Sequence, residues 1–363
     1  MLKSKRWISL IIMFAVLLLA GCAGEVLEAP PMTTVPDIFT QPSESAEPTQ
    51  PVQTEAPETT EPTIEKEPAG AGSLSHGVMN AIRDETGVYL LYQGGEMHMS
   101  YSINASGTVG RDGLGILLFV DGQLQPYKTA NDDTYKYMHI FYPQDGVELI
   151  EEFIFIPVAG QEGDVLEIWY TSIETPDYCL ADGVQGAVLS NGSVSAGTKL
   201  KYEATPPDAE YPENIDRITE PVISYVDLNP GAVSGWSDAD WQEKYEFRMY
   251  VNGSDSMYIY NITEEPVTLR FEVWGNTYVH YGLVFFVDNE PVSVAEEDTI
   301  FFGVNNGQKT VVEVQLDMTG FDGESVVYAA LVPRNWRSAE VLTMTWLDMT
   351  RTFFLVAGDP PEN

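Results

Sequence analysis

Residues 73–358, which we call the body of the chain, carry the same strand-like pattern twice. Residues 115–122 (GILLFVDG) match residues 282–289 (GLVFFVDN), and each copy is an apolar run followed by a two-residue turn signal. Upstream, residues 97–103 and 267–273 place apolar side chains at every second position, which predicts a strand with one buried face. A repeat this long predicts a duplicated domain, because solenoid repeats span only about 20–50 residues.

Two further matches extend the duplication downstream. Residues 146–155 align with 307–316, and residues 163–168 align with 323–328. Each copy holds roughly seven strand-like runs separated by Gly, Asn, Asp or Pro, a spacing typical of small sandwiches. The sequence therefore predicts an all-β fold with two tandem immunoglobulin-like or fibronectin-like β-sandwich domains.

The domain boundaries follow from these copies and from changes in composition. Residues 237–244 are expected to form one short helix, with Ser237 and Asp240 as its capping pair. The expected parts are a leader (1–21), a stalk (22–72), a first sandwich (73–204), a linker (205–218), a second sandwich (219–358) and a tail (359–363).

The first residues have the character of a secretion signal. A positively charged start precedes an apolar run over residues 7–19, which is too short to cross about 30 Å of hydrocarbon as a helix. The run ends in Leu19-Ala20-Gly21-Cys22, which closely resembles the lipobox of bacterial lipoproteins. That resemblance implies cleavage before Cys22 and acylation of its thiol, a durable membrane anchor. The alternative is an ordinary signal peptide cut after Ala23.

Residues 22–72 are expected to be a disordered stalk. They contain nine prolines, eight threonines and ten acidic residues against one lysine, and they show no apolar periodicity. Such a segment cannot bury enough apolar surface to fold, and at ~3.1 Å per residue it would reach at most about 150 Å. The expected location of the body is therefore the outer face of the bacterial membrane, exposed to the cell wall and the extracellular space.

Charge excludes some partners. The chain has 18 Lys and Arg against 55 Asp and Glu, a formal net charge of -37. A field of this sign repels phosphate backbones and anionic lipid surfaces, so neither nucleic acid nor broad docking onto a membrane surface is expected. The expected partners are the membrane, through the lipid anchor, and a glycan or a surface protein.

No motif for catalysis or for a cofactor occurs. The four histidines never fall at a zinc-ligand spacing, and no nucleophile elbow or phosphate-cradling loop is present. Acidic runs at 131–133, 238–240 and 296–298 lack the calcium-loop pattern and are interpreted as solvated turns. We therefore expect no enzyme, no cofactor and no metal site.

Aromatic and cationic residues outside the strand pattern give the candidate ligand-binding set. Trp236 and Trp241 lie in a polar segment, where large rings either stack on a sugar or cover an open edge of a sandwich. Arg334 and Arg337 flank Trp336 and are candidates for holding an anionic or glycan group, or for pairing with nearby carboxylates.

The predicted function is that of a non-enzymatic surface protein that presents its sandwiches for extracellular binding or adhesion. Anchor, stalk and duplication all serve presentation, and the body resembles the broad class of immunoglobulin-like surface domains. A glycan-binding module is the first alternative. A cell-envelope or polysaccharide hydrolase, which needs a cleft with a close carboxylate pair, is the second.

Overall fold

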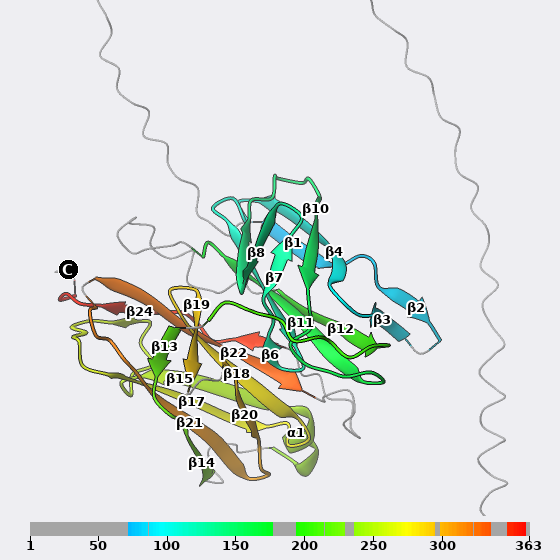
Figure 1. Cartoon of the computed structure of the whole chain (residues 1–363). Coiled ribbons are helices and arrows are strands. Elements are labelled where there is room, and N and C mark those ends of the chain that lie inside the picture. The colour runs from blue at the N-terminus through cyan, green and yellow to red at the C-terminus, as the bar shows by residue number, and fades with distance from the viewer. Residues whose placement is uncertain are drawn as a thin grey trace, which may run out of the picture. The chain divides into compact units, whose positions relative to one another are not determined.

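A computed structural model describes most of the body of the chain (Figure 1). Strands hold more than half of its described residues, and turns, loops and one short helix, α1 (Asp238–Glu243), hold the rest. Among the described residues no helix is long and apolar enough to cross a membrane. Residues 64–363 form one compact unit. The described ranges are 72–85, 87–176, 194–213, 215–228, 236–294, 298–321, 323–334 and 347–360.

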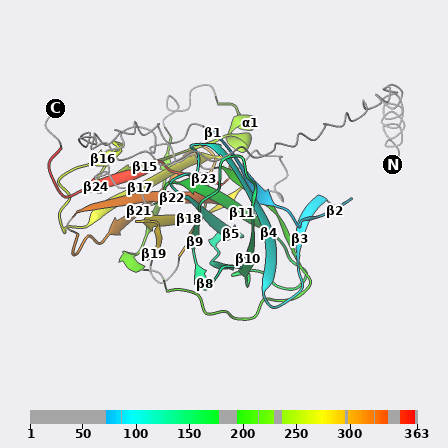
Figure 2. The ribbon, with the colours of Figure 1, turned by 90° about the horizontal axis from the view of Figure 1, so that it is seen from above.

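Two sheets form the first sandwich (Figure 2). The first, in spatial order, contains β1 (Gly72–Val78), β4 (Met97–Gly107), β10 (Leu149–Phe155), β7 (Tyr127–Thr129) and β8 (Asp132–Lys136). The second contains β2 (Ile82–Asp84), β3 (Gly87–Tyr92), β12 (Ser195–Tyr202), β11 (Val165–Glu174), β5 (Leu114–Val120) and β6 (Gln123–Leu124), with β9 (Met138–Phe141) paired to β5.

The core of the first sandwich follows from the alternation along β4. Met99, Tyr101 and Ile103 are fully buried, whereas the residues between them are partly exposed. Phe153 of the neighbouring β10 stacks on Tyr101 with ring centroids 4.5 Å apart. These residues share one core with residues of the second sheet, so the two sheets pack face to face.

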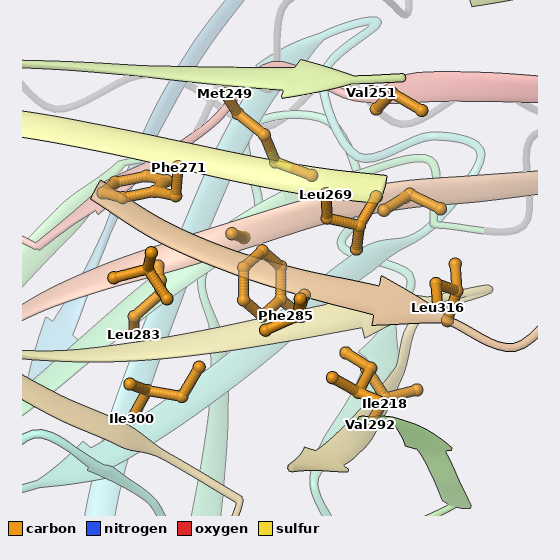
Figure 3. Close-up of a cluster of buried hydrophobic side chains, with 14 of the residues drawn as sticks. Ile218, Met249, Val251, Leu269, Phe271, Leu283, Phe285, Val292, Ile300 and Leu316 are labelled. Atoms are coloured by element: carbon orange, nitrogen blue, oxygen red, sulfur yellow. The ribbon is translucent and has the colours of Figure 1, made fainter. Parts of the chain in front are cut away.

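A third sheet forms the second sandwich by folding over on itself. One set of its strands comprises β15 (Tyr245–Val251), β17 (Val267–Gly275), β21 (Gln308–Leu316), β14 (Val222–Asp227) and β13 (Ile215–Ile218). The other comprises β19 (Glu290–Val294), β18 (His280–Val287), β20 (Ile300–Gly303), β22 (Glu324–Arg334), β23 (Asp348–Met349), β24 (Phe353–Val356) and β16 (Tyr258–Ile259). Side chains from both sets, Phe271 and Phe285 among them, lie in one buried cluster (Figure 3).

The all-β sandwich class is thus confirmed, and strand registers repeat between the copies. Met99 pairs with Phe153 in the first sandwich, and the aligned Leu269 pairs with Val314 in the second. Each apolar run also enters a hairpin as predicted, because β5 pairs with β6 and β18 pairs with β19. The turn residues Asp121-Gly122 and Asp288-Asn289 all have positive φ, the conformation of a type I′ hairpin.

Two details differ from the prediction. Val120 pairs with Ile168 and Val287 pairs with Val327, so the alignment of 163–168 with 323–328 is wrong by one residue. The predicted linker 205–218 also ends in a strand, because β13 joins the sheet of the second sandwich. The predicted helix is confirmed: α1 follows the N-cap Ser237, which forms a capping box with Asp240.

A further core, which we call the shared core, joins the two sandwiches. The shared core explains why β5 departs from the usual alternation of a sandwich strand. All seven of its residues are buried, rather than every second one. Leu114, Ile116, Leu118 and Val120 face the core of the first sandwich, and the residues between them face the second sandwich. The buried residues of the shared core are Leu117, Phe119, Leu124, Tyr137, Trp169 and Ile173 from the first sandwich and Val284, Phe286, Tyr328, Ala330, Val332, Leu347 and Met349 from the second.

Equivalent positions of the two copies meet in the shared core. In the corrected alignment Phe119 corresponds to Phe286, and Trp169 corresponds to Tyr328. The same strand faces of the duplicated domain are therefore buried against each other. This is the residue pattern of an isologous dimer interface, here built within one chain.

Candidate functional site

Arg334, a predicted ligand-binding residue, lies at the end of β22 beside the first sandwich. Its guanidinium group forms an ion pair with the carboxylate of Asp121 in the hairpin turn after β5. The guanidinium carbon lies 4.2 Å from the ring centroid of Phe301. The side chains of Arg334 and Asp121 are 29% and 18% exposed. This ion pair is partly desolvated and connects the two sandwiches, which agrees with the alternative that Arg334 pairs with a carboxylate. Its ligand-binding role stays a prediction.

The opposite hairpin makes the corresponding contact. Asn289, in the turn after β18, donates a side-chain hydrogen bond to the carbonyl of Pro176, which follows β11 of the first sandwich. Each copy thus places its hairpin turn against the end of the long central strand of the other. Trp169 adds a third polar link, because its Nε1 donates to the carbonyl of Pro333 at 3.1 Å.

Backbones approach closely at this junction. A Cβ built on Gly282 would lie 2.3 Å from the carbonyl oxygen of Gly122 in the other sandwich. No real Cβ tolerates such a distance, and the obstacle is backbone rather than the end of a flexible side chain. Glycine at position 282 is therefore needed for the two sandwiches to come together as they do.

The predicted tryptophan pair lies at α1. The rings of Trp236 and Trp241 meet edge to face with centroids 5.1 Å apart. Trp241 is 8% exposed, and its carbonyl accepts a hydrogen bond from the amide of Thr277, just beyond β17. Trp236 is partly buried. The structure therefore brings the two rings together as a cover over one end of β17, and sugar stacking on them stays a prediction.

Other predicted residues fall outside the description. Trp336 and Arg337, as well as the anchor Cys22, do not belong to the described ranges. Within those ranges no group of three or more His, Cys, Asp or Glu side chains is arranged to hold a metal ion.

A cavity that the sequence did not predict lies in the second sandwich. Its volume is about 250 Å³. Edge strand β15 supplies one wall, and the turn between β23 and β24 supplies the other. The lining residues are Phe247, Arg248, Met249, Asp255, Thr350 and Arg351.

Both arginines of the cavity are positioned by aromatic rings. The guanidinium carbon of Arg248 lies 5.5 Å from the ring centroid of Trp274, and that of Arg351 lies 5.3 Å from the ring centroid of Phe353. A side-chain hydrogen bond with Tyr250 raises the pKa of Arg248, so this group stays charged. No sequence signal marks the pair, because Arg248 occupies an ordinary outward position of a strand and Arg351 lies far away in the chain.

The base of the cavity is apolar and internally satisfied. Met249 is 4% exposed and belongs to the core of the second sandwich. The hydroxyl of Thr350 accepts from the amide of Ala329 at 2.8 Å and lies 3.6 Å from the sulfur of Met249. The other polar residues that line the cavity are Arg248, Arg351 and Asp255, and the Arg248 side chain also forms a hydrogen bond with Tyr250.

No protein-family model matches this chain, and a search of curated proteins finds no match. Solved structures show weak likeness. The Salmonella enterica SafA pilin in complex with the SafB chaperone is 12% identical, with 78% of this chain and 96% of that chain covered, at a TM-score of 0.22. A protein of unknown function from Porphyromonas gingivalis is 8% identical, with 78% and 99% covered, at a TM-score of 0.20. The collagen adhesin from S. aureus is 8% identical, with 79% and 95% covered, at a TM-score of 0.15. Likeness at this level carries no argument about activity.

Proposed function

We propose that this chain is a lipid-anchored cell-surface protein whose two sandwiches act together as one non-enzymatic binding module outside the cell. The observation that carries the proposal is the shared core, which turns a tandem repeat into a single body. A body that is already ordered loses less entropy on binding than two domains on a hinge. The duplication thus favours presentation of one extended, preorganised surface.

The sequence supports the surface location. The apolar run, the motif Leu19-Ala20-Gly21-Cys22 and the Pro-rich acidic segment that follows fit a leader, an acylation site and a spacer. A spacer of this reach would lift the body away from the membrane. An acidic body would stay soluble and would not adhere to anionic lipid.

Replacement of the anchor cysteine tests the location. In the native host, Cys22→Ala is expected to release the protein from the membrane fraction, because no thiol is left to acylate. Cys179→Ala, the matched control at the other cysteine, is expected to stay with the membranes. Membrane retention of the Cys22→Ala protein would contradict the anchor.

Exposure and binding are tested on intact cells. An antibody against the body is expected to label wild-type cells and to lose access when residues 30–68 are deleted. Wild-type cells should also attach to an extracellular partner panel of glycans and surface proteins better than cells whose protein lacks residues 72–363. Equal attachment of the two strains to every member of the panel would argue against a binding role.

A further inference from the structure

We propose that the cavity between Arg248 and Arg351 is a binding site for a carboxylate carried on a small apolar body. The assignment rests on the proposed binding function and gives that function a ligand class. It starts from a contrast of charge: in a chain with 55 acidic and 18 basic side chains, two arginines line the same small cavity.

Arg351 retains donors for a ligand. The Nη2 atom of Arg351 lies 3.8 Å from the nearest carboxylate oxygen of Asp255, which is beyond hydrogen-bond distance. The Asp255 side chain is also 77% exposed, so water screens this pair. A ligand carboxylate inside the cavity would lie closer to the Arg351 guanidinium than Asp255 does, and it would be less exposed to solvent.

The shape of a guanidinium group favours a planar anion. The guanidinium carbons lie 5.5 Å from the ring centroid of Trp274 and 5.3 Å from that of Phe353, and a cation–π contact of this kind does not require the N–H groups. A guanidinium edge matches the two oxygens of a carboxylate, which it can bind through two parallel hydrogen bonds. A single negative charge also meets less repulsion from the acidic body than a doubly charged phosphate would.

The volume of the cavity and the polarity of its wall indicate what else the ligand contains besides the carboxylate. A volume of about 250 Å³ lies just below the range of about 300–1,000 Å³ that is usual for ligand pockets, so the ligand is small. Phe247 and Met249 supply an apolar wall, and the Thr350 hydroxyl is already engaged. The ligand class is therefore a monocarboxylate with one compact apolar group, such as an aromatic acid.

The open side of the second sandwich explains why a cavity forms here. β15 and β16 are the two ends of the strand order in the third sheet, so these edges are not closed by pairing with each other. Asp255 lies in the connection between β15 and β16, which crosses this opening. The cavity therefore lies where the two layers of the sandwich part, rather than in a loop that folds independently of them.

Benzoate is the probe, and the methyl group of Met249 is the reporter. The protein would be residues 22–363 with Cys22→Ser, labelled with ¹³C at the methyl groups of its methionines, with the Met249 signal assigned by Met249→Leu. Titration with benzoate should shift the Met249 signal, because the ring would lie against it. Benzamide, which has the same shape without charge, and acetate, which has the charge without the ring, should each bind at least about tenfold more weakly.

Variants locate the anion. Arg248→Gln and Arg351→Gln keep most of the stem and should each weaken benzoate binding about tenfold, since each removes a charge-assisted contact. Asp255→Asn should tighten it severalfold, because a repelling carboxylate at the rim is lost. Arg111→Ala, which breaks an exposed pair with Asp112 in the first sandwich, should leave the affinity unchanged.

Three results would overturn the assignment. They are no shift of Met249 up to the solubility limit of benzoate, equal binding of benzoate and benzamide, and wild-type affinity in both Gln variants. The comparison of benzoate with benzamide uses the unaltered site, so it stands even if a variant folds poorly. Loss of benzoate binding in all tests would leave the surface location and cell attachment untouched, so the two proposals fail separately.

Discussion

Replacement of Trp169 should uncouple the two sandwiches. The side chain is fully buried in the shared core, and its Nε1 donates to the carbonyl of Pro333 in the other sandwich. Trp→Ala in a core costs about 3–5 kcal/mol, and the lost hydrogen bond adds about 1 kcal/mol. At about 2–4 °C per kcal/mol for a body of this size, the melting temperature should fall by on the order of 10 °C.

The neighbouring residue on the same strand provides the matched control. Ile168 is also fully buried, but it faces the core of the first sandwich. Ile168→Ala should cost about 2–5 kcal/mol as well, so the two variants lose similar stability in different cores. The difference between them should be the number of unfolding transitions.

Differential scanning calorimetry measures the number of unfolding transitions. The wild-type body and Ile168→Ala should each unfold in one transition, because the shared core couples the sandwiches. Trp169→Ala should unfold in two transitions, one for each sandwich. A single transition in Trp169→Ala, or two already in the wild type, would refute the coupling.

Two further predictions concern a backbone contact and a buried carboxyl group. Gly282→Ala should lower the free energy of unfolding by about 1–3 kcal/mol, because its Cβ would meet the carbonyl oxygen of Gly122 at 2.3 Å. At the aligned position, Gly115→Ala meets the flexible end of Met138 and should cost less; equal denaturation midpoints for the two variants would count against the close approach. Burial raises the pKa of the Asp348 carboxyl group from 3.8 to about 6. The folded protein therefore binds the carboxyl proton more tightly than the unfolded chain does. The free energy of unfolding falls as the pH rises through about 4 to 6. Asp348→Asn should therefore stabilise the folded protein above pH 6 by on the order of 1–2 kcal/mol, after allowance for the partial exposure of the side chain. It should have little effect near pH 4. A gain in stability that does not depend on pH would contradict an origin in the buried carboxyl group.

The strands were readable from the sequence, because their period is a local property. Alternation at 97–103 and 267–273 predicted strands with one buried face, and β4 and β17 carry that pattern. The Asp121-Gly122 and Asp288-Asn289 turns were readable for the same reason, since each depends on two adjacent residues. The capping pair of α1 also lies within four residues.

The shared core leaves a signal in the sequence that indicates burial but does not identify the partner. Residues 115–120 are continuously apolar, which indicates burial on both faces, and one sandwich core covers only one face of a strand. What covers the second face depends on residues of the other copy, such as Phe286 and Tyr328. Their proximity arises only from tertiary packing.

The candidate sites were harder for the same reason. The chain neighbours of Arg334 mark it as a candidate, but its charge partner Asp121 is 213 positions away. The two arginines of the cavity come from β15 and from the turn after β23, and neither stands out locally. Exposure cannot be predicted from the polarity of the neighbouring residues either. Trp241 lies in a polar segment, yet it is a buried residue of α1.

The distance between the two sandwiches in solution tests the central claim most directly. Spin labels at Ile150→Cys in β10 and Glu246→Cys in β15, with the two natural cysteines replaced by serine, report that distance by pulsed electron resonance. Both sites are exposed and lie outside the shared core. A single body predicts one narrow distance distribution that broadens when Trp169→Ala is added. A broad distribution with Trp169 intact would contradict the account.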